Sequence, residues 1–529
     1  MPGKLPIGIQ SFEKLRSEKF VYVDKTEYIY QLVRNTVPYF LSRPRRFGKS
    51  LLLSTLRSYW EGKKELFRGL KINKLLAGKK DVWKPYPVFY FDFNGANYSD
   101  KHALEDVLDI HLKRLEKQYE VQEKDGLLSE RFQNLLVKAR KVTGRRVVVL
   151  VDEYDKPLLD VIDKPELEER NKEIFKGFFS SLKSYDEYLQ FVFITGVTRF
   201  NKVSIFSDLN QLNDISLNRE FDALCGITEY EVHQYFNDEV EMLAQRQSLT
   251  KDVCLLALKQ KYDGYTFCPG GTEVYNPFSL LKSFYEYAFG SYWFETGTPT
   301  FLVKKLKETE FDVRKLSDKT LYANESTLSN YQADNSNPIP LLYQSGYLTI
   351  VDYDAVDHVF TLAFPNEEVK YGFLENLLPE YSPASVVGSG NDVFTLRKYV
   401  EQGDCDKIML VLQSLFASIT YTRTGDIFEH YFQMVIYLVF TLLGKFAQCE
   451  LQMFDGRIDC VLKTKDFIYV FEFKCDTSPS VALEQIESKD YALPFVADDR
   501  DLYKIGVAFD SKTRKLVDWV IEGCIKVAE

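Results

Sequence analysis

A run near the N-terminus places a glycine, a lysine and a serine as in a phosphate-binding loop. The usual pattern is G-x-x-x-x-G-K-[ST]; Gly48, Lys49 and Ser50 match its end, and Arg43 stands where the first glycine belongs. Amide groups at a helix start attract anions, a lysine can reach the β- and γ-phosphates of a nucleotide, and a serine hydroxyl can bind Mg²⁺. An apolar run precedes this segment and a helical pattern follows it, so we expect a phosphate loop rather than a chance G-K-S.

Two arginines add positive charge at the same place. Arg45 and Arg46 could contact phosphate, although either could instead pair with a carboxylate of the fold. The residues predicted to bind the cofactor at this loop are Arg45, Arg46, Phe47, Gly48, Lys49, Ser50 and Leu51.

Two acids follow a second apolar run. Val147–Val151 leads directly into Asp152 and Glu153. In a nucleotide-hydrolysing α/β domain, the first acid orients Mg²⁺ and the second polarises the attacking water. The alternative is a pair of solvated acids at a strand end, which is common in α/β proteins. The occurrence of these acids together with the Gly48-Lys49-Ser50 run favours the nucleotide site.

Further polar residues come after the apolar run Phe191–Ile194. Thr195 could sense the γ-phosphate, and Arg199 could stabilise developing charge as an arginine finger. Polar turn residues and a surface arginine are an alternative that the sequence leaves equally open.

A carboxylate–lysine cluster is predicted near the C-terminus. Glu472 and Lys474 lie two residues apart in a strand pattern, so both project from one face, and Asp459 lies on the strand before them. Two carboxylates can bind a divalent cation and a lysine can help to activate water, which is the equipment for metal-assisted phosphodiester cleavage. Cross-strand charge pairing is the alternative, but these charges interrupt an otherwise apolar strand, where unpaired charge is costly to bury.

Helical residues on both sides of this hairpin could complete the cluster. Glu429 could supply another carboxylate to the metal, and Gln485 could orient the water or touch the substrate backbone. Lys489 and Tyr491 follow Gln485 at helical spacing. For Glu429, Lys489 and Tyr491, an ordinary place on a helix surface is equally open. The predicted metal ligands at the two sites are Ser50, Asp152, Glu429, Asp459 and Glu472.

The length and composition of the chain indicate several domains, which must position these residues. The chain has 529 residues, a net charge of −10 and 45% apolar residues, which indicates a folded, soluble, multidomain protein. This charge excludes a protein that binds polyanions by bulk charge.

The most apolar stretch, Tyr431–Phe446, is short and interrupted, so a buried helix is expected rather than a membrane span. The start lacks a signal peptide, and eight cysteines contain no C-x-x-C pair; we therefore expect a cytoplasmic protein.

Three regions differ in pattern. Residues 1–225 alternate β-rich runs and helices and predict a mostly parallel α/β sheet. Residues 226–385 predict a helical region, in which a helix ending near Gly346 precedes two strand patterns; this is either a winged-helix unit or an unspecialised helix–hairpin. A turn-rich break is expected at 381–392, and residues 386–529 return to α/β character.

Several motifs together make the chain resemble the bacterial AAA-ATPase-like family. The resemblance is carried by Phe12-x-x-Leu15-Arg16, Tyr22-Val23-Asp24-Lys25-Thr26, Arg43–Ser50, Val151–Pro157, Thr195–Phe200, Tyr262-Asp263-Gly264-Tyr265, Tyr275-Asn276-Pro277 and Phe364-Pro365-Asn366. Gly456–Asp459, Glu472-Phe473-Lys474 and Gln485-Ile486 are similar to the PD-(D/E)XK nuclease superfamily. The family also has Arg43 in place of the first glycine of the loop.

The resemblance implies an α/β protein with a P-loop NTPase core of the AAA/RecA-like kind, a helical or winged-helix middle region and a restriction-endonuclease-like C-terminal domain. It implies ATP and Mg²⁺ as cofactors and nucleic acid, with DNA favoured, as a partner; no membrane partner is expected, and homo-oligomerisation is left open. The leading hypothesis is an ATPase joined to a metal-dependent nuclease. The alternative is a nucleotide-dependent switch whose tail binds nucleic acid or a partner without cutting. The segment Leu396–Glu529 carries a net charge of −5, unlike the basic surface usual in DNA-binding domains.

Overall fold

The computed structural model divides the chain into two compact units. The N-terminal unit consists of Met1–Gly297 and Leu316–Val369, and the C-terminal unit of Thr298–Lys315 and Lys370–Glu529. The predicted three-domain division at residues 225 and 385 stays a prediction. The structure describes residues 3–35, 37–79, 82–122, 126–199, 212–296, 302–303, 305–306, 309, 311–316, 321–329, 337–381, 389–417, 427–444, 448–454, 457–495, 497–513 and 515–524. Within these ranges only the backbone is described at 295–296, 329, 380–381, 389–392, 427–433, 448–454, 457–459 and 524.

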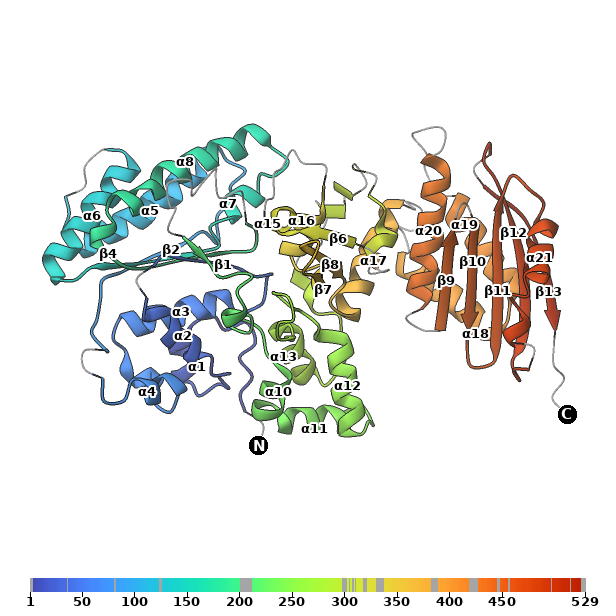
Figure 1. Ribbon diagram of the computed structural model, residues 1–529, viewed down its shortest axis with the longest axis horizontal. Coiled ribbons are helices and arrows are strands. Elements are labelled where there is room, and N and C mark those ends of the chain that lie inside the picture. The colour runs from blue at the N-terminus through green and yellow to red at the C-terminus, as the bar shows by residue number, and fades with distance from the viewer. Residues whose placement is uncertain are drawn as a thin grey trace. The chain divides into compact units, whose positions relative to one another are not determined.

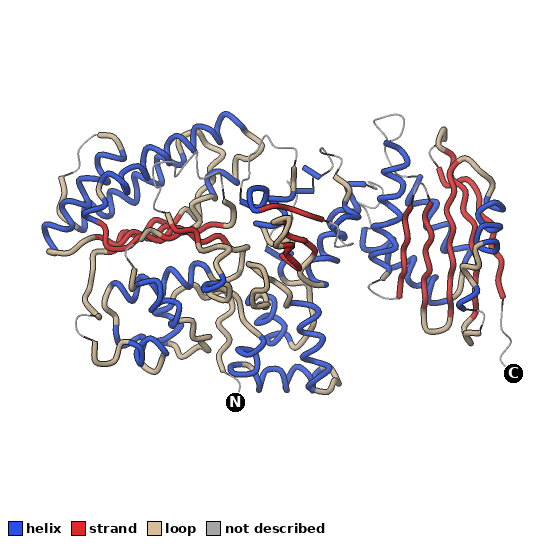
Figure 2. Tube along the Cα trace, in the orientation of Figure 1, coloured by secondary structure: helices blue, strands red, loops and turns tan. Residues whose placement is uncertain are grey.

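A five-stranded parallel sheet forms the centre of the N-terminal unit (Figures 1 and 2). Its strands are, in spatial order, β2 (Val88–Asp92), β3 (Val147–Asp152), β4 (Leu189–Gly196), β1 (Tyr39–Ser42) and β5 (Asn213–Asp214). All residues of β1 and β3 are buried, as expected for apolar strands covered on both faces. The predicted parallel α/β core is confirmed.

Helices cover both faces of this sheet (Figure 1). One face carries α1 (Phe12–Ser17), α2 (Thr26–Val33), α3 (Lys49–Trp60) and α4 (Lys71–Leu75). The other carries α5 (Ala103–Gln118), α6 (Leu128–Thr143), α7 (Lys156–Leu159) and α8 (Pro165–Ser184). Helix α3 follows β1 directly, which is the strand–loop–helix context that the phosphate loop requires.

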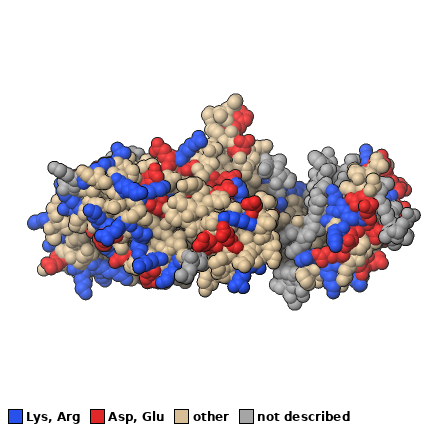
Figure 3. Space-filling model, turned by 90° about the horizontal axis from the view of Figure 1, so that it is seen from below, with Lys and Arg blue, Asp and Glu red and all other residues tan. Residues whose placement is uncertain are grey.

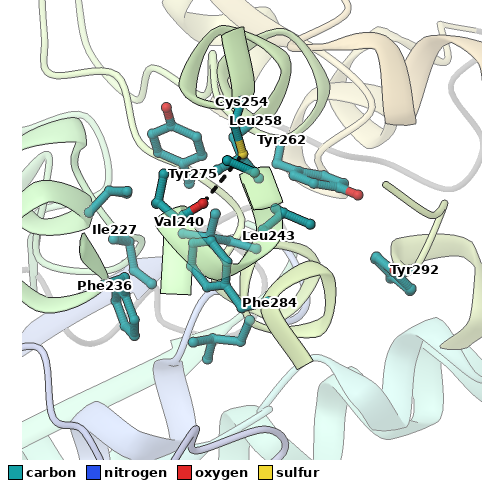
Figure 4. Packing of buried hydrophobic residues seen from close by; sticks show 14 residues of the cluster. Ile227, Phe236, Val240, Leu243, Cys254, Leu258, Tyr262, Tyr275, Phe284 and Tyr292 are labelled. Carbon is teal, nitrogen blue, oxygen red and sulfur yellow. Dashed lines mark hydrogen bonds between the residues drawn. The ribbon is translucent and has the colours of Figure 1, made fainter. Parts of the chain in front are cut away.

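A helical bundle follows β5 in the same unit. Its helices are α10 (Glu229–Tyr235), α11 (Asn237–Arg246), α12 (Lys251–Tyr262) and α13 (Pro277–Glu286). Their apolar faces meet in the core of Figure 4, where the rings of Phe236 and Phe284 stack with centroids 5.6 Å apart. Apolar residues of the N-terminal segment pack against this same core, so the bundle is joined to the start of the chain. These residues are Leu5, Ile7, Val21 and Val23.

A small antiparallel sheet lies further along the N-terminal unit. The chain order is β6 (Leu321–Asn324), α15 (Glu325–Ser329), α16 (Ile339–Gln344), β7 (Thr349–Asp354) and β8 (Val359–Ala363), and the spatial order of the strands is β6-β8-β7. The winged-helix hypothesis requires a strand, two helices and a hairpin in this order. It also requires the second strand of the hairpin (β8) to pair with the initial strand (β6), as it does here. Helix α17 (Glu367–Tyr381) follows.

A mixed five-stranded sheet forms the centre of the C-terminal unit (Figure 1). Its order is β13 (Lys515–Cys524), β12 (Asp501–Asp510), β11 (Phe467–Cys475), β10 (Arg457–Lys463) and β9 (Gln448–Phe454). Only β11 and β12 are parallel, and α21 (Pro479–Ser488) connects them. Helices α18 (Ser389–Gln402), α19 (Cys405–Ala417) and α20 (Ile427–Leu443) belong to this unit, and so does most of α17. The α/β prediction for this region is confirmed.

The two faces of β11 have different coverings. The rings of Phe471 and Phe473 contact Phe440 of α20, at centroid distances of 5.2 and 5.8 Å. On the opposite face, Ile468 and Val470 pack against α21. Because side chains alternate along a strand, Glu472 and Lys474 project on the α21 face.

One difference from the expected elements has a local cause, and one expected helix is present. Of the break predicted at 381–392, Tyr381 belongs to α17 and residues 389–392 belong to α18, while 382–388 lie outside the described residues. Serine and aspartate are favoured at helix starts. Helix α20 covers most of the apolar stretch that was expected to be a buried helix, and residues 434–440 are buried. Among the described residues, no helix is both long and apolar enough to cross a bilayer.

Candidate functional site

The phosphate loop connects β1 to α3 at the carboxyl edge of the parallel sheet, where ligands of such sheets bind. Gly48 caps α3 with a φ of 93°, a conformation that favours glycine. A Cβ at Gly48 would meet nothing within 4 Å, so the requirement is conformational rather than spatial. Arg46 also has a positive φ, of 70°, and the two residues turn the loop back over the helix start.

The predicted phosphate-binding lysine lies inside this loop. The Lys49 ammonium group donates hydrogen bonds to the carbonyl oxygens of Arg43 (2.9 Å) and Pro44 (3.1 Å). Burial lowers the pKa of Lys49, while three nearby carboxylates oppose that shift. Carbonyl oxygens are weaker partners for an ammonium group than a phosphate dianion is, so Lys49 can exchange them for a nucleotide.

Asp152 ends β3 beside the start of α3, and its side chain is only 1% exposed. Tyr90 donates a hydrogen bond to Oδ2 at 3.2 Å, and Oδ1 has no hydrogen-bond partner among the described residues. Burial raises the pKa of Asp152 to about 6, against the lowering effects of the Ser50 hydroxyl and the Lys49 ammonium group. A buried carboxylate oxygen with no partner next to a serine hydroxyl fits a divalent cation.

Asp152→Asn should stabilise the nucleotide-free protein near neutral pH. The pKa of Asp152 is raised from 3.8 to about 6 in the folded state, so the folded protein holds the proton more tightly than the unfolded chain does. Stability therefore falls as pH rises through this window and levels off above it. The gain from the substitution should grow between about pH 4 and about pH 6, towards roughly 2–3 kcal/mol.

Thermal melting of both proteins across this range measures the effect. Asp106→Asn, at an exposed position of α5, is the matched control. A melting-temperature difference between wild type and Asp152→Asn that stays constant, or shrinks, with rising pH would contradict the prediction.

The segment after β3 turns sharply. Glu153 has a φ of 49° and lines the same cavity as Lys49. Asp155 accepts hydrogen bonds at Oδ2 from the amides of Val197 (3.0 Å) and Thr198 (2.6 Å) and from the Thr198 hydroxyl (2.6 Å). Asp155, which the pattern did not single out, therefore fixes the turn after β4 to the turn after β3.

Thr195 and Arg199 do not line the cavity. Thr195 is fully buried at the end of β4, and its hydroxyl has no described hydrogen-bond partner. Arg199 is 5% exposed, forms an ion pair with Asp214 and donates its amide to Gln344 Oε1 at 2.7 Å. Arg199 is thus not a surface arginine, and its predicted role at the γ-phosphate requires it to leave Asp214.

A cavity of about 510 Å³ extends from the phosphate loop. Its polar end contains the predicted loop residues from Arg45 to Leu51, together with Glu153. Its apolar wall comes from the N-terminal segment and the helical bundle, and includes Ile7, Ile9, Val21, Val23, Ile29, Ile227, Phe236, Phe278 and Leu281. The volume is that of an ordinary small-molecule site, and one end suits phosphate while the other suits an apolar ring.

The three arginines of the loop have different surroundings. Arg45 and Arg46 are both exposed, and the Arg46 guanidinium lies 4.8 Å from the centre of the Phe278 ring. Arg43 is 2% exposed and donates hydrogen bonds to the carbonyl oxygens of Ser42, Ser216 and Phe221. Arg43 therefore holds the base of the loop to the segment after β5, and it is not a phosphate ligand here.

The carboxylate–lysine cluster lies on the α21 face of the C-terminal sheet. Glu472 is fully buried, and the Lys474 ammonium group lies 2.9 Å from Glu472 Oε1. In the antiparallel register Asp459 is directly opposite Glu472, so its backbone position places it on the same face. Gly506, the partner of Glu472 on β12, lies so close to α21 that a Cβ would be 2.3 Å from the carbonyl oxygen of Pro479.

The structure describes the side chains of only some of the other predicted members of the cluster. The Gln485 amide nitrogen is buried without a described partner, Lys489 is exposed and Tyr491 packs at the edge of the α21 core. The side chains of Glu429 and Asp459 lie outside the described residues. Among the side chains that are described, no group of three or more His, Cys, Asp and Glu could hold a metal ion; the carboxylate pair at the hairpin therefore stays a prediction.

These features define an α/β unit with a parallel sheet of P-loop-like strand order, followed by a second unit with the strand layout of a restriction-endonuclease-like fold. Residues 6–206 match the AAA-ATPase-like family model, described as "Predicted AAA-ATPase", and residues 427–519 match the PD-(D/E)XK nuclease superfamily. The chain is 36% identical over 530 residues to an "Uncharacterized protein in vnfD 5'region" of Azotobacter chroococcum mcd 1, covering 98% of this chain and 99% of that protein. The chain belongs to the AAA-ATPase-like family and carries a C-terminal PD-(D/E)XK nuclease superfamily domain. Both parts of the resemblance are confirmed.

Proposed function

We propose that the N-terminal unit binds ATP with Mg²⁺ and hydrolyses it. The observation that carries this proposal is the charge of the cavity at the phosphate loop. Although the whole chain has a charge of −10, the cavity wall contains five basic residues and two acidic ones. These are Lys25, Arg45, Arg46, Lys49 and Lys156 against Asp92 and Glu153. A positive cavity in an acidic protein selects an anionic ligand.

The roles within this site follow from position. Lys49 donates to the phosphates after it leaves its loop carbonyls, and the loop amides beside Gly48 face the same anion. Ser50 and Asp152 hold Mg²⁺, which neutralises charge on the phosphate oxygens when it is bound. Glu153, one of the two acids of the cavity wall, accepts a proton from the attacking water. Thr195 and Arg199 are proposed to act only after a movement that brings them to the cavity.

For the C-terminal unit we propose metal-dependent cleavage of nucleic acid phosphodiesters, with DNA favoured. Asp459 and Glu472 hold the cation, Lys474 activates water or stabilises charge, and Gln485 orients the water. The proposal is supported by the register that pairs Asp459 with Glu472 and by the proximity of Lys474 to Glu472. Glu429 is kept as a further candidate ligand.

One alternative has specific support: a nucleotide-dependent switch whose C-terminal unit binds nucleic acid or a partner without cutting. The segment Leu396–Glu529 carries a net charge of −5, and Figure 3 shows basic side chains lying among acidic ones on the visible face of this unit. Glu472 is also fully buried. Neutralisation of phosphate charge dominates the affinity of a protein for nucleic acid. A surface of mixed charge therefore lowers that affinity and favours weak binding or a short nucleic acid.

The two functions are tested together on the wild-type protein. Calorimetric titration with ATP and Mg²⁺ should give a dissociation constant of about 1 μM to 1 mM. Single- and double-stranded DNA and RNA are then incubated with Mg²⁺ or Mn²⁺, with and without ATP, and cleavage is expected on at least one substrate. ATP binding with no cleavage anywhere supports the switch, and no nucleotide binding overturns the proposal for the N-terminal unit.

A further inference from the structure

A second lysine reaches the cavity from outside the phosphate loop. Lys25 belongs to the Tyr22–Thr26 run and precedes α2, yet its side chain lines the same cavity as Lys49. Its backbone is held by the neighbouring Asp24, whose Oδ1 accepts hydrogen bonds from the Thr26 amide (2.9 Å) and hydroxyl (2.6 Å). The Lys71 amide donates to Asp24 Oδ2 at 2.7 Å. The position of Lys25 is therefore fixed independently of its own side chain.

The partner of Lys25 is an acid at the start of the helical bundle. The Lys25 ammonium group lies 2.7 Å from Glu231 Oε2, and both side chains are 13% exposed. The same oxygen accepts the amide of Thr228 at 2.9 Å, as part of the capping box of α10. An ammonium group has three N–H donors, and Glu231 is its one hydrogen-bond acceptor among the described residues. Lys25 thus retains donors for a ligand in the cavity.

The positive charges of Lys25 and Lys49 lie near the same part of the cavity. Burial raises the pKa of the Cys225 thiol, and the positive charges of Arg43, Lys49 and Lys25 oppose this shift. Cys225 lines the cavity too. The two lysine charges therefore lie around one side chain, although one belongs to the phosphate loop and the other to the N-terminal segment. Two ammonium groups on one region suit a ligand with more than one negative charge.

We propose that Lys25 is a second phosphate-binding lysine of this site, and that bound phosphate competes with Glu231 for its ammonium group. The proposal rests on nucleotide binding in the N-terminal unit. Glu231 belongs to α10, and the N-terminal segment packs against the bundle that α10 begins. Nucleotide binding therefore weakens an ion pair between the two walls of the cavity, and the position of the bundle becomes dependent on the ligand.

The test compares Lys25→Met and Glu231→Gln by calorimetry with ATP and with adenosine. Lys25→Met should weaken ATP binding by about tenfold or more, because a hydrogen bond to a charged group is lost, and should leave adenosine binding unchanged. Glu231→Gln keeps an acceptor for the Thr228 amide but removes the competing charge, so it should strengthen ATP binding. If the ion pair only braces the bundle, both substitutions weaken ATP and adenosine binding together, and the proposal is overturned.

Two further measurements separate this proposal from the one on which it rests. Lys64→Met, at an exposed position near α3, controls for loss of a lysine elsewhere, and melting curves show whether each variant folds. If the wild type does not bind ATP, nucleotide binding itself fails. If the wild type binds ATP and Lys25→Met binds it equally well, the role of Lys25 fails alone. Should Lys25→Met not fold, the direction of the Glu231→Gln effect decides.

Discussion

Replacing Lys49 with alanine should abolish measurable ATP binding. Lys49 is only 4% exposed, and its ammonium group is held by two loop carbonyls in the ligand-free protein. A nucleotide offers several charged oxygens instead, and each hydrogen bond to a charged group contributes about 1.5–3 kcal/mol. Loss of two such bonds weakens binding by roughly a hundredfold or more.

The measurement is a calorimetric titration with ATP and Mg²⁺, accompanied by phosphate release. Lys64→Ala removes an exposed lysine and should match the wild type. Because the Lys49 side chain is buried, melting curves of the variant are needed as well; its loop carbonyls become solvated, so the fold is expected to persist. Unchanged ATP affinity in a folded Lys49→Ala protein would remove the phosphate loop from the proposed function.

Replacing Glu472 with glutamine should abolish metal-dependent cleavage while it keeps the side-chain shape. Glu472 is fully buried and lies opposite Asp459 in the hairpin register. Removal of one carboxylate lowers the affinity of the pair for a divalent cation, and electrostatic stabilisation of this kind contributes about a hundred- to thousandfold in rate. Asp459→Ala should have the same effect on cleavage.

A second readout does not depend on turnover. Mn²⁺ or Mg²⁺ should raise the melting temperature of the wild-type C-terminal unit, by ligand linkage, and should not raise that of Glu472→Gln. Glu484→Gln, at an exposed position of α21, is the matched control. Cleavage by Glu472→Gln at the wild-type rate would refute the assignment, whereas metal binding without cleavage by the wild type would favour the switch.

Local patterns were sufficient to predict the strand–loop–helix segment that contains Gly48, Lys49 and Ser50, because these residues are neighbours between β1 and α3. Local patterns also predicted the end of β3 and the face shared by Glu472 and Lys474, since period-two alternation is a property of one strand. Strand ends were less accurate: β1 is Tyr39–Ser42, whereas the apolar run begins at Val37. An apolar residue can precede a strand as easily as belong to it.

Partners that lie far apart in the chain could not be predicted. The ion pair of Lys25 with Glu231 spans 206 residues, and no periodicity connects its two members. The motif containing Lys25 was visible in the sequence, but its chemistry depends on which wall of the cavity it meets. The edge strand β13 is hard to predict for another reason: it carries charges at Lys515, Asp518 and Glu522, as exposed edge strands do.

The buried position of Arg43 limits how this loop can evolve. Its guanidinium satisfies three carbonyl oxygens and lies 4.0 Å from the centre of the Phe267 ring. A single replacement of Arg43 by the glycine of the common pattern would leave those oxygens without their donor and open a void beneath the loop. The unusual arginine is therefore entrenched: it can be exchanged only if residues near Ser216 and Phe267 change with it.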